Sequence, residues 1–348
     1  MRFHLLGLPN APISKKYNSN PFIIKCYHMA DMMTSLGYEV FTYGVEGSEA
    51  NANNITCLSN ESFDHFYPYN PEIVGYDYDD LQPWREFNSN CARAIETNKQ
   101  DGDVILCPMG HYHDLVRDHT KLPCVEFSIG HIASTDKNYR IFESYSWANF
   151  VYGSENKQLP HEMDTVIPAF FDPKDFDSTQ ETEKYLLFIG RLIPEKGIDL
   201  AIKTAEYAKM KLIVAGVGDY KPQSDYVEYI GSINVEQRKE LLAKAKALLV
   251  PSQYNEPFGS VVIEAMLSGT PIISSNRGAL PEINLHRQTG FVCWCEQDYY
   301  DAYDNLIKLQ TDKNWKHYDQ YSKEKVRWSY DTYFKRLDQY LKQDVKTN

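Results

Sequence analysis

The stretch that carries most information is Glu256-Pro-Phe-Gly-Ser-Val-Val-Ile-Glu264. It follows an apolar run that predicts a strand over Ala247–Pro251, and it opens a predicted helix. Gly259 allows the backbone to turn into that helix, whose free first-turn amides and positive dipole end favour a bound phosphate. Glu256 lies before the helix and Glu264 one turn inside it, so the two carboxylates can flank such a ligand. An ordinary acidic helix start followed by a solvated Glu is the alternative interpretation.

A second charged motif, Ile189-Gly-Arg-Leu-Ile-Pro-Glu-Lys-Gly197, lies at another predicted junction between strand and helix. Arg191 and Lys196 would project from this glycine-flanked loop. A guanidinium donates a fork of hydrogen bonds to phosphate oxygens, and an ammonium supplies a compact charge for a leaving diphosphate. The motif fits a phosphate site, although by itself it fits a surface loop equally well.

Short apolar runs alternate with helical stretches along the whole chain, which is typical of βαβ units and parallel sheets. We therefore expect an α/β protein with two Rossmann-like domains. In the first half the predicted strands are Phe3–Leu8, Glu39–Tyr43, Val104–Cys107, Cys124–Ser128 and Phe150–Gly153, with a helix over Phe22–Leu36 and a long loop over Asn60–Leu81. In the second half the predicted strands are Tyr185–Gly190, Lys211–Ala215, Tyr226–Gly231, Ala247–Pro251, Pro271–Ser275 and Phe291–Cys293. The predicted helices there are Ile198–Lys209, Val235–Lys244, Ser260–Ser268, Tyr299–Leu309 and Ser329–Lys342.

The length of 348 residues suits two domains of roughly 150 residues each. A polar, proline-punctuated segment, Pro168–Glu183, differs from both of its neighbours and is the expected linker. We place one domain over residues 1–170 and the other over 171–324, with a C-terminal helix at about 325–345 packing back on the first. Two such domains facing each other would put the carboxyl ends of their strands, and hence ligand sites, in the cleft between them.

Composition limits the classes of partner. The net charge of −12 does not favour nucleic acid or an anionic membrane surface. No apolar run approaches the roughly 18 residues of a membrane span, and the N-terminus has no cleavage-site pattern. The seven cysteines are scattered and odd in number, so reduced thiols in a cytoplasmic protein fit better than a disulfide framework.

Five segments, taken in order, carry a resemblance to a known family. They are Phe188–Gly197, Pro251-Ser252, Glu256–Glu264, Ser268–Ile273 and Gly278–Ile283. Over about residues 184–295 the chain resembles the donor domain of the GT-B glycosyltransferases, specifically the retaining family 4 with its Glu-x7-Glu motif. The resemblance implies transfer of a sugar from a nucleotide-diphosphate sugar to a hydroxyl acceptor such as a glycan. It also implies retention of the anomeric configuration by same-face attack, and no metal or other cofactor.

The resemblance also implies a role for each matching residue. Arg191 and Lys196 would hold the donor diphosphate. Glu256 would contact the donor sugar near its reacting face, and Glu264 would bind the ribose hydroxyls. Donor binding would further involve Phe258, backbone amides at Gly259, Ser260 and Val261, and Gly231 in the segment Tyr229–Ile233, where the family holds the base.

The first half resembles the family less. The loop after the first predicted strand has no glycine pair, and Lys15 and Lys16 stand there instead, either to reach a phosphate or as part of a solvated loop. His131 occupies the position at which family members present a histidine toward the donor sugar, so we include it among the catalytic candidates. A structural role is the alternative for this lone histidine.

Other signals point to different classes of protein. Asp77-Tyr-Asp79 and Asp175-Phe-Asp177 have the spacing of a metal–diphosphate site but lie outside the donor motifs, and His111-Tyr-His113 lacks further ligands. A nicotinamide-dependent dehydrogenase needs a full Gly-x-Gly-x-x-Gly, which neither Leu8–Lys16 nor Leu212–Gly218 supplies. A catalytically inactive nucleotide-sugar-binding scaffold is the non-enzyme alternative, against which the intact charged residues argue.

Overall fold

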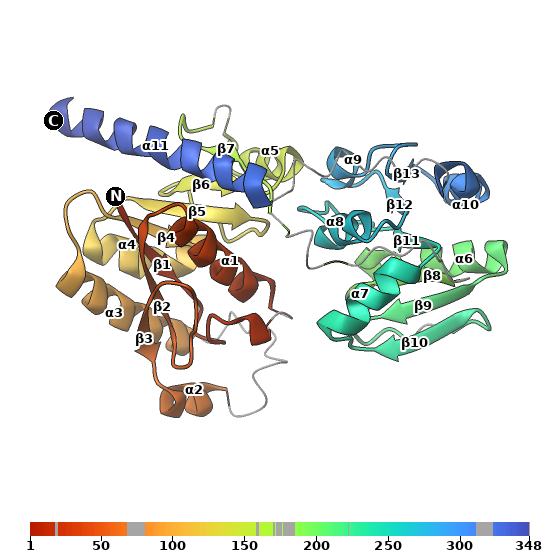
Figure 1. Cartoon of the computed structure of the whole chain (residues 1–348), viewed down its shortest axis with the longest axis horizontal. Helices are drawn as coiled ribbons and strands as arrows, with labels where there is room; N and C mark the ends of the chain where they lie inside the picture. The colour runs from red at the N-terminus through yellow and green to blue at the C-terminus, as the bar shows by residue number, and fades with distance from the viewer. Residues whose placement is uncertain are drawn as a thin grey trace. The chain divides into compact units, whose positions relative to one another are not determined.

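The computed structural model describes residues 1–17, 20–67, 81–157, 160–169, 171, 176, 185–221, 223–310 and 323–347. Internal contacts divide the chain into two compact units, each with its own parallel sheet and helices (Figure 1). Unit 1 comprises Met1–Glu143, Val151–Ile167 and Arg327–Asn348, and unit 2 comprises Ser144–Phe150 and Pro168–Val326. The predicted α/β class with two Rossmann-like sheets is confirmed.

Unit 1 has a seven-stranded sheet in the order β3-β2-β1-β4-β5-β6-β7, and every neighbouring pair is parallel. Its strands are β1 (Arg2–Leu6), β2 (Glu39–Val45), β3 (Asn53–Leu58), β4 (Val104–Cys107), β5 (Cys124–Ile129), β6 (Tyr139–Phe142) and β7 (Thr165–Val166). Its helices include α1 (Pro21–Ser35), α2 (Asn60–Phe66), α3 (Leu81–Asn98) and α4 (Asp114–Thr120). The last helix, α11 (Lys323–Thr347), packs on this unit, since the Phe334 ring lies 4.7 Å from that of Phe3 and Asp331 accepts a hydrogen bond from Tyr38 at 3.3 Å.

Unit 2 has a six-stranded parallel sheet in the order β10-β9-β8-β11-β12-β13. Its strands are β8 (Tyr185–Ile189), β9 (Lys211–Ala215), β10 (Val227–Gly231), β11 (Ala247–Val250), β12 (Ile272–Ser275) and β13 (Gly290–Cys293). Its helices are α6 (Ile198–Ala208), α7 (Val235–Lys244), α8 (Ser260–Leu267), α9 (Leu280–Ile283) and α10 (Glu296–Gln310). The strand order reverses between β8 and β11, and in such sheets ligands bind at the carboxyl ends of the strands beside that reversal.

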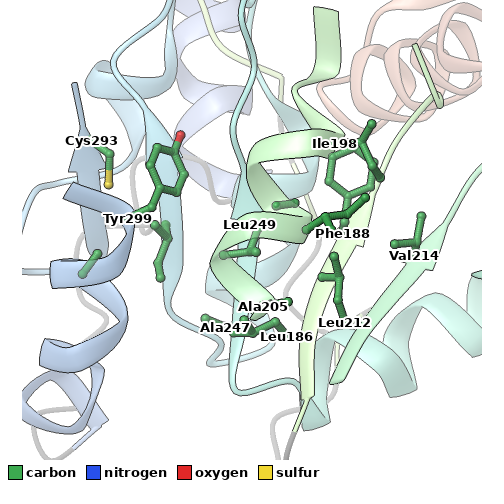
Figure 2. Packing of buried hydrophobic residues seen from close by; sticks show 14 of the residues in the cluster. Leu186, Phe188, Ile198, Ala205, Leu212, Val214, Ala247, Leu249, Cys293 and Tyr299 are labelled. Atoms are coloured by element: carbon green, nitrogen blue, oxygen red, sulfur yellow. The ribbon is translucent and has the colours of Figure 1, made fainter. Parts of the chain in front are cut away.

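Both faces of the second sheet are buried, which explains its nearly continuous apolar strands. Leu186 and Phe188 of β8 point to one side, where they pack with Ile198 of α6 and Tyr299 of α10 (Figure 2). The residues that alternate with them, Tyr185 and Leu187, point to the other side and pack with α8. Alternate residues of a strand face opposite sides, so one five-residue strand anchors two helical layers.

Two of the segments for which the sequence made a prediction have a different structure. The predicted strand Phe150–Gly153 is wrong, because these residues lie in helix α5 (Tyr145–Ser154). Ser144 caps that helix by accepting a hydrogen bond from the Trp147 amide at 3.0 Å, and β6 takes the sheet position instead. The predicted loop over Asn60–Leu81 begins with α2, which Ser59 caps by accepting from the Ser62 amide at 3.2 Å. Residues 68–80 lie outside the described residues.

The boundaries of the two units can be compared with the expected domain boundaries. It falls at Pro168, three residues before the boundary placed at 171, and it assigns Ser144–Phe150 to unit 2. Most of the expected linker lies outside the described residues. Within the ranges that the structure describes, no helix is both long and apolar enough to cross a membrane.

Candidate functional site

The two charged motifs of unit 2 meet because they follow the strands on either side of the reversal. The loop after β8 carries Lys196, and the loop after β11 carries Glu256. The loops are tied by a hydrogen bond from the Gln253 amide to the Glu195 carbonyl at 2.7 Å. At Gly197, where φ is 72°, a Cβ would lie 1.9 Å from the Pro251 carbonyl oxygen. Only glycine permits this approach of the two loops. Lys196 and Glu256, 60 residues apart in the sequence, can therefore be in direct contact.

Lys196 forms an ion pair with Glu256. Its Nζ lies 2.9 Å from Oε2 and 3.2 Å from Oε1 of that carboxylate. It also donates to the Tyr254 hydroxyl at 2.8 Å. The Tyr254 hydroxyl donates to Glu256 Oε1 at 2.7 Å, and the Ser252 hydroxyl donates to Oε2 at 2.8 Å. Glu256 is only 7% exposed, so these donors replace the water that a carboxylate needs.

Arg191 lies in the same loop as Lys196 and is exposed. Burial and the Glu256 charge hold the pKa of Tyr254 above its ordinary value, and the positive charge of Arg191 acts in the opposite direction. Tyr254 therefore keeps its proton and acts as a donor. The structure thus joins Lys196 directly to Glu256 and places Arg191 in the same loop as Lys196, near enough for its charge to act on Tyr254.

The segment after β12 packs against the backbone of Glu256 and hydrogen-bonds to it. Gly278, with φ of 59°, lies so close that a Cβ there would be 2.2 Å from the Glu256 carbonyl oxygen, which accepts from the Ala279 amide at 2.8 Å. Farther along, the Glu282 carboxylate accepts hydrogen bonds from the Tyr145 and Ser146 amides at 3.0 and 2.6 Å. The segment Gly278–Ile283, which the resemblance included, therefore supports the loop that carries Glu256.

Helix α8 begins at Ser260 directly after this loop. Its N-cap, Gly259, has φ of 92° and provides no side-chain cap. First-turn amides of an uncapped helix end are suited to an anion. One turn in, Glu264 is 8% exposed and accepts a hydrogen bond at Oε1 from Arg238 Nη1 of α7 at 3.1 Å. Its Oε2 is buried and has no hydrogen-bond partner within the described part of the chain.

Other predicted donor-site residues have different surroundings. The Phe258 side chain is 3% exposed and packs in the core, so any part it plays in binding is through its backbone. Val261 is half-buried beside the exposed Ser260. Gly231 ends β10 with φ of 74°, and its carbonyl accepts from the Gly216 amide at 2.8 Å.

The glycines after β9 serve backbone packing. A Cβ at Gly216 would lie 1.8 Å from the Gly190 carbonyl oxygen, and one at Gly218 would lie 2.4 Å from that of Leu192. These glycines let the turn after β9 support the loop that carries Arg191. The glycines at positions 216 and 218 are therefore explained by backbone packing within unit 2.

His131 belongs to unit 1, where it follows β5. Its Nε2 lies 2.8 Å from the Pro108 carbonyl oxygen, to which it donates, and its Nδ1 accepts from the Ala133 amide at 3.1 Å. Burial lowers its pKa to about 4, so the ring is neutral near pH 7. Both ring nitrogens are used by backbone groups of unit 1, Nε2 by the segment after β4 and Nδ1 by its own loop, and contact with a ligand would require one of these bonds to be exchanged.

A fully buried carboxyl lies beneath this loop. Glu126 of β5 accepts hydrogen bonds from the Ser134 hydroxyl at 3.1 Å and the Thr135 amide at 3.3 Å. Burial raises its pKa to about 8. Gly110 approaches it so closely that a Cβ there would be 2.8 Å from Glu126 Oε1. The carboxyl is therefore part of the packing that shapes the loop of His131.

The two lysines of the first loop are exposed. Lys15 Nζ lies 5.6 Å from the centre of the Tyr27 ring, and Lys16 Nζ lies 3.7 Å from Glu49 Oε1 with both side chains more than half exposed. These are surface contacts, which contribute little to stability. Both lysines remain accessible to an anion.

No group of three or more His, Cys, Asp or Glu side chains among the described residues is arranged to hold a metal ion. The Asp77–Asp79 and Asp175–Asp177 pairs lie outside those residues. His111 donates through Nδ1 to the Ala133 carbonyl at 2.9 Å, and His113 shares a hydrogen bond with Asn88 at 3.1 Å. Burial lowers the pKa of His113 to about 3.

Sequence reasoning missed three side chains that complete the site. Ser252 and Tyr254 lie two to four residues before Glu256, so their closeness was visible although their direction was not. Arg238 is 26 residues from Glu264 and comes from a different helix. No local spacing signals that contact, because it depends on how α7 and α8 pack.

Comparison with known proteins finds relatives of part of the chain. A family model described as "Glycosyl transferases group 1" matches residues 171–328. An uncharacterized glycosyltransferase of Methanocaldococcus jannaschii is 38% identical over 128 residues, which make up 32% of each protein. Glycogen synthase of Mycobacterium tuberculosis is 34% identical over 126 residues, 31% of this chain and 30% of the relative. The chain thus aligns with about a third of the length of these curated relatives.

Solved structures match over nearly the whole chain. AviGT4, a glycosyltransferase involved in avilamycin A biosynthesis, has a TM-score of 0.65 at 20% identity, covering 97% of this chain and 98% of its own. HepE of Anabaena, solved in complex with UDP and glucose, has a TM-score of 0.66 at 14% identity and covers 97% and 100%. At such identities the likeness shows the fold. The chain thus has the GT-B fold of these glycosyltransferases, and its residues 171–328 match the family of group 1 glycosyl transferases.

Proposed function

We propose that this chain transfers a sugar from a nucleotide-diphosphate sugar to a hydroxyl acceptor, with retention of the anomeric configuration. The observation that carries the proposal is the ion pair of Lys196 and Glu256 beside Arg191, at the reversal point of the second sheet. A buried carboxylate paired with one cation, with a second cation in the same loop, suits a ligand that is anionic at its diphosphate and rich in hydroxyls at its sugar. The family match over residues 171–328 supports the same chemistry.

The ligand would occupy unit 2 in a defined direction. Its diphosphate would lie at the start of α8, near Gly259 and Ser260, with Arg191 and Lys196 as counter-charges. Oε2 of Glu264 would accept a hydrogen bond from a ribose hydroxyl, which satisfies a buried oxygen that has no partner among the residues that the structure describes. That HepE was solved with UDP and with UDP-glucose supports a nucleotide-sugar donor.

Transfer would need little covalent chemistry from the protein. The bond between the anomeric carbon and the diphosphate oxygen breaks as the acceptor oxygen bonds to the same face of that carbon. The acceptor proton passes to an oxygen of the leaving diphosphate. Arg191 and Lys196 would stabilise the charge that develops on this group, so a metal ion is not required.

The thiols support a cytoplasmic setting. All seven cysteines are free, and Cys107 and Cys124 keep their sulfur atoms 3.4 Å apart without a bond. Reduced cysteines are the rule in reducing compartments. We therefore propose that the enzyme works in the cytoplasm.

The proposal is tested by a panel of UDP-, GDP- and ADP-sugars. A specific donor should raise the apparent melting temperature, because a ligand that binds only the folded state stabilises it by mass action. The same donor should be hydrolysed slowly to free sugar and nucleoside diphosphate. Binding without any turnover, with or without candidate acceptors, would instead favour an inactive scaffold, and no binding at all would contradict the proposal.

A further inference from the structure

The Tyr254 hydroxyl links the two charged groups of the site. It accepts a hydrogen bond from Lys196 Nζ at 2.8 Å and donates one to Glu256 Oε1 at 2.7 Å. One side chain thus holds the cation by its hydroxyl oxygen, and the carboxylate by its hydroxyl proton.

The partners of Glu256 fall into two kinds. Lys196 comes from the loop after β8, and its side chain is long, flexible and 20% exposed. Tyr254 and Ser252 lie on the same segment as Glu256, and each donates to a different carboxylate oxygen. If the ammonium leaves, both oxygens still have a hydroxyl donor. A buried carboxylate without these donors would be strongly unfavourable.

A bound diphosphate competes with Glu256 for Lys196. We infer that Tyr254 is a positioning residue: together with Ser252 it holds the Glu256 carboxylate charged and aimed when Lys196 turns to the donor diphosphate. This inference rests on the proposed function. The hydroxyl suits the task because burial and the neighbouring carboxylate keep Tyr254 protonated.

Tyr254→Phe removes the hydroxyl and keeps the ring. Because Glu256 acts where charge develops on the sugar, we expect kcat to fall on the order of ten-fold, with the donor KM and the affinity for bare nucleoside diphosphate changed by less than about three-fold. A tyrosine that only supported the fold would lower the melting temperature without this separation of kcat from KM.

A double-mutant cycle isolates the path through the carboxylate. In the background of Glu256→Ala, or of Glu256→Gln if the alanine variant does not fold, Tyr254→Phe should change kcat by less than about two-fold. Tyr207→Phe is the matched control. Its hydroxyl also donates to a carboxylate, that of Asp304, at 2.7 Å, but on the exposed surface of α6 and α10.

The outcomes separate the two claims. Equal losses from Tyr254→Phe in both backgrounds, or a loss confined to donor affinity, would overturn the role of Tyr254 while leaving the proposed function intact. A wild-type chain that turns over no donor would end the proposed function, and the role of Tyr254 in transfer with it. A coupled loss of kcat, absent from Tyr207→Phe, would establish the positioning role.

Discussion

Arg238 donates to one carboxylate oxygen of Glu264 at 3.1 Å, while the other oxygen of Glu264 is buried and has no hydrogen-bond partner among the described residues. The guanidinium belongs to α7 and the carboxylate to α8, so packing of two helices fixes the direction of the free oxygen. A buried acceptor that lacks a donor is uncommon in a folded protein. Its position one turn into α8 fits a ligand hydroxyl as the missing donor.

Glu264→Gln should therefore weaken donor binding. The substitution keeps the shape but exchanges a charge-assisted hydrogen bond, worth about 1.5–3 kcal/mol, for a weaker one. Since the ribose is bound equally in ground and transition states, we expect a donor KM raised by roughly ten-fold or more and a smaller change in kcat. Calorimetry with bare nucleoside diphosphate should show a comparable loss of affinity. Unchanged affinity would place the ribose elsewhere.

Arg238→Ala should also lower the affinity for the donor, though by less than Glu264→Gln, because Arg238 no longer orients the Glu264 carboxylate. Lys239→Ala is the matched control, since it removes a positive charge from the neighbouring position of α7, where Lys239 lies 3.6 Å from Glu236. Both are measured by titration with bare nucleoside diphosphate. Equal effects of the two variants would mean that general charge, and not the orientation of Glu264, governs affinity.

Glu256→Gln should have the opposite signature. The side chain is assigned to the sugar, so kcat should fall while the affinity for bare nucleoside diphosphate is kept. The ion pair with Lys196 also predicts the direction in which the affinity for bare nucleotide should change. Without the charge of Glu256, Lys196 is free for the diphosphate, and bare nucleotide should bind slightly more tightly. A clear loss of nucleotide affinity would mean that the roles of Glu256 and Glu264 are exchanged.

Lys196→Ala should lower turnover on the order of 100-fold or more, because it removes charge next to the leaving group. Thermal unfolding must accompany the kinetics, since the change also leaves the buried Glu256 without its cation. Lys203→Ala serves as control, as its ion pair with Glu296 is exposed and lies on α6. A folded Lys196→Ala protein with near-normal rates would show that the diphosphate binds elsewhere.

A chelator should leave turnover essentially unchanged, because Arg191, Lys196 and the start of α8 balance a diphosphate without an ion. The measurement compares initial rates in EDTA with rates in added magnesium or manganese. Complete loss of turnover in EDTA, restored by manganese, would mean that a metal ion binds the diphosphate, with Asp77 and Asp175 as candidate ligands.

The buried groups of unit 1 predict a stability maximum near pH 6.5. The pKa values of His131 and His113 fall to about 4 and 3 on folding from an ordinary value near 6.5. The unfolded chain binds more protons below pH 6.5, so the stability contributed by these histidines rises as the pH approaches that value. The pKa of Glu126 rises to about 8, so its contribution is full below about pH 4 and is lost as the pH rises through 8. Above pH 6.5 only this loss remains, with a slope of up to about 1.4 kcal/mol per pH unit.

Urea unfolding of the wild type and of Glu126→Gln across pH 5 to 8.5 checks this expectation. The variant should lose less stability than the wild type between pH 6.5 and 8, because a neutral amide does not titrate. Parallel profiles for the two proteins would show that Glu126 stays ionised in the folded state.

The contrast between strongly and weakly patterned segments explains what the sequence could predict. In unit 2, β9 and α7 have the predicted limits, Lys211–Ala215 and Val235–Lys244. Apolar runs bounded by glycine and helix caps define such elements locally. In unit 1, Phe150–Gly153 was apolar enough for a strand, and the Ser144 cap that makes it helical was a weaker signal than the run itself.

The same distinction holds for the site. Motif order predicted Arg191, Lys196 and Glu256, because loops after strands beside the reversal point must converge. The contact of Arg238 with Glu264 depends on tertiary packing between helices, which no local pattern encodes. The direction of the Tyr254 hydroxyl depends on a loop held by Gly197 and Gln253, and such loop geometry follows from backbone contacts.

The first seven residues assigned to unit 2, Ser144–Phe150, make this unit discontinuous along the gene. Ser144 donates its hydroxyl proton to the Pro257 carbonyl at 2.6 Å, and the Tyr145 and Ser146 amides satisfy Glu282. A recombinant fragment starting at Pro168 would lack these donors on both sides of the Glu256 loop. Dissection of the protein into halves should therefore yield an incomplete donor module, unless Ser144–Phe150 is supplied by a fusion or a circular permutation.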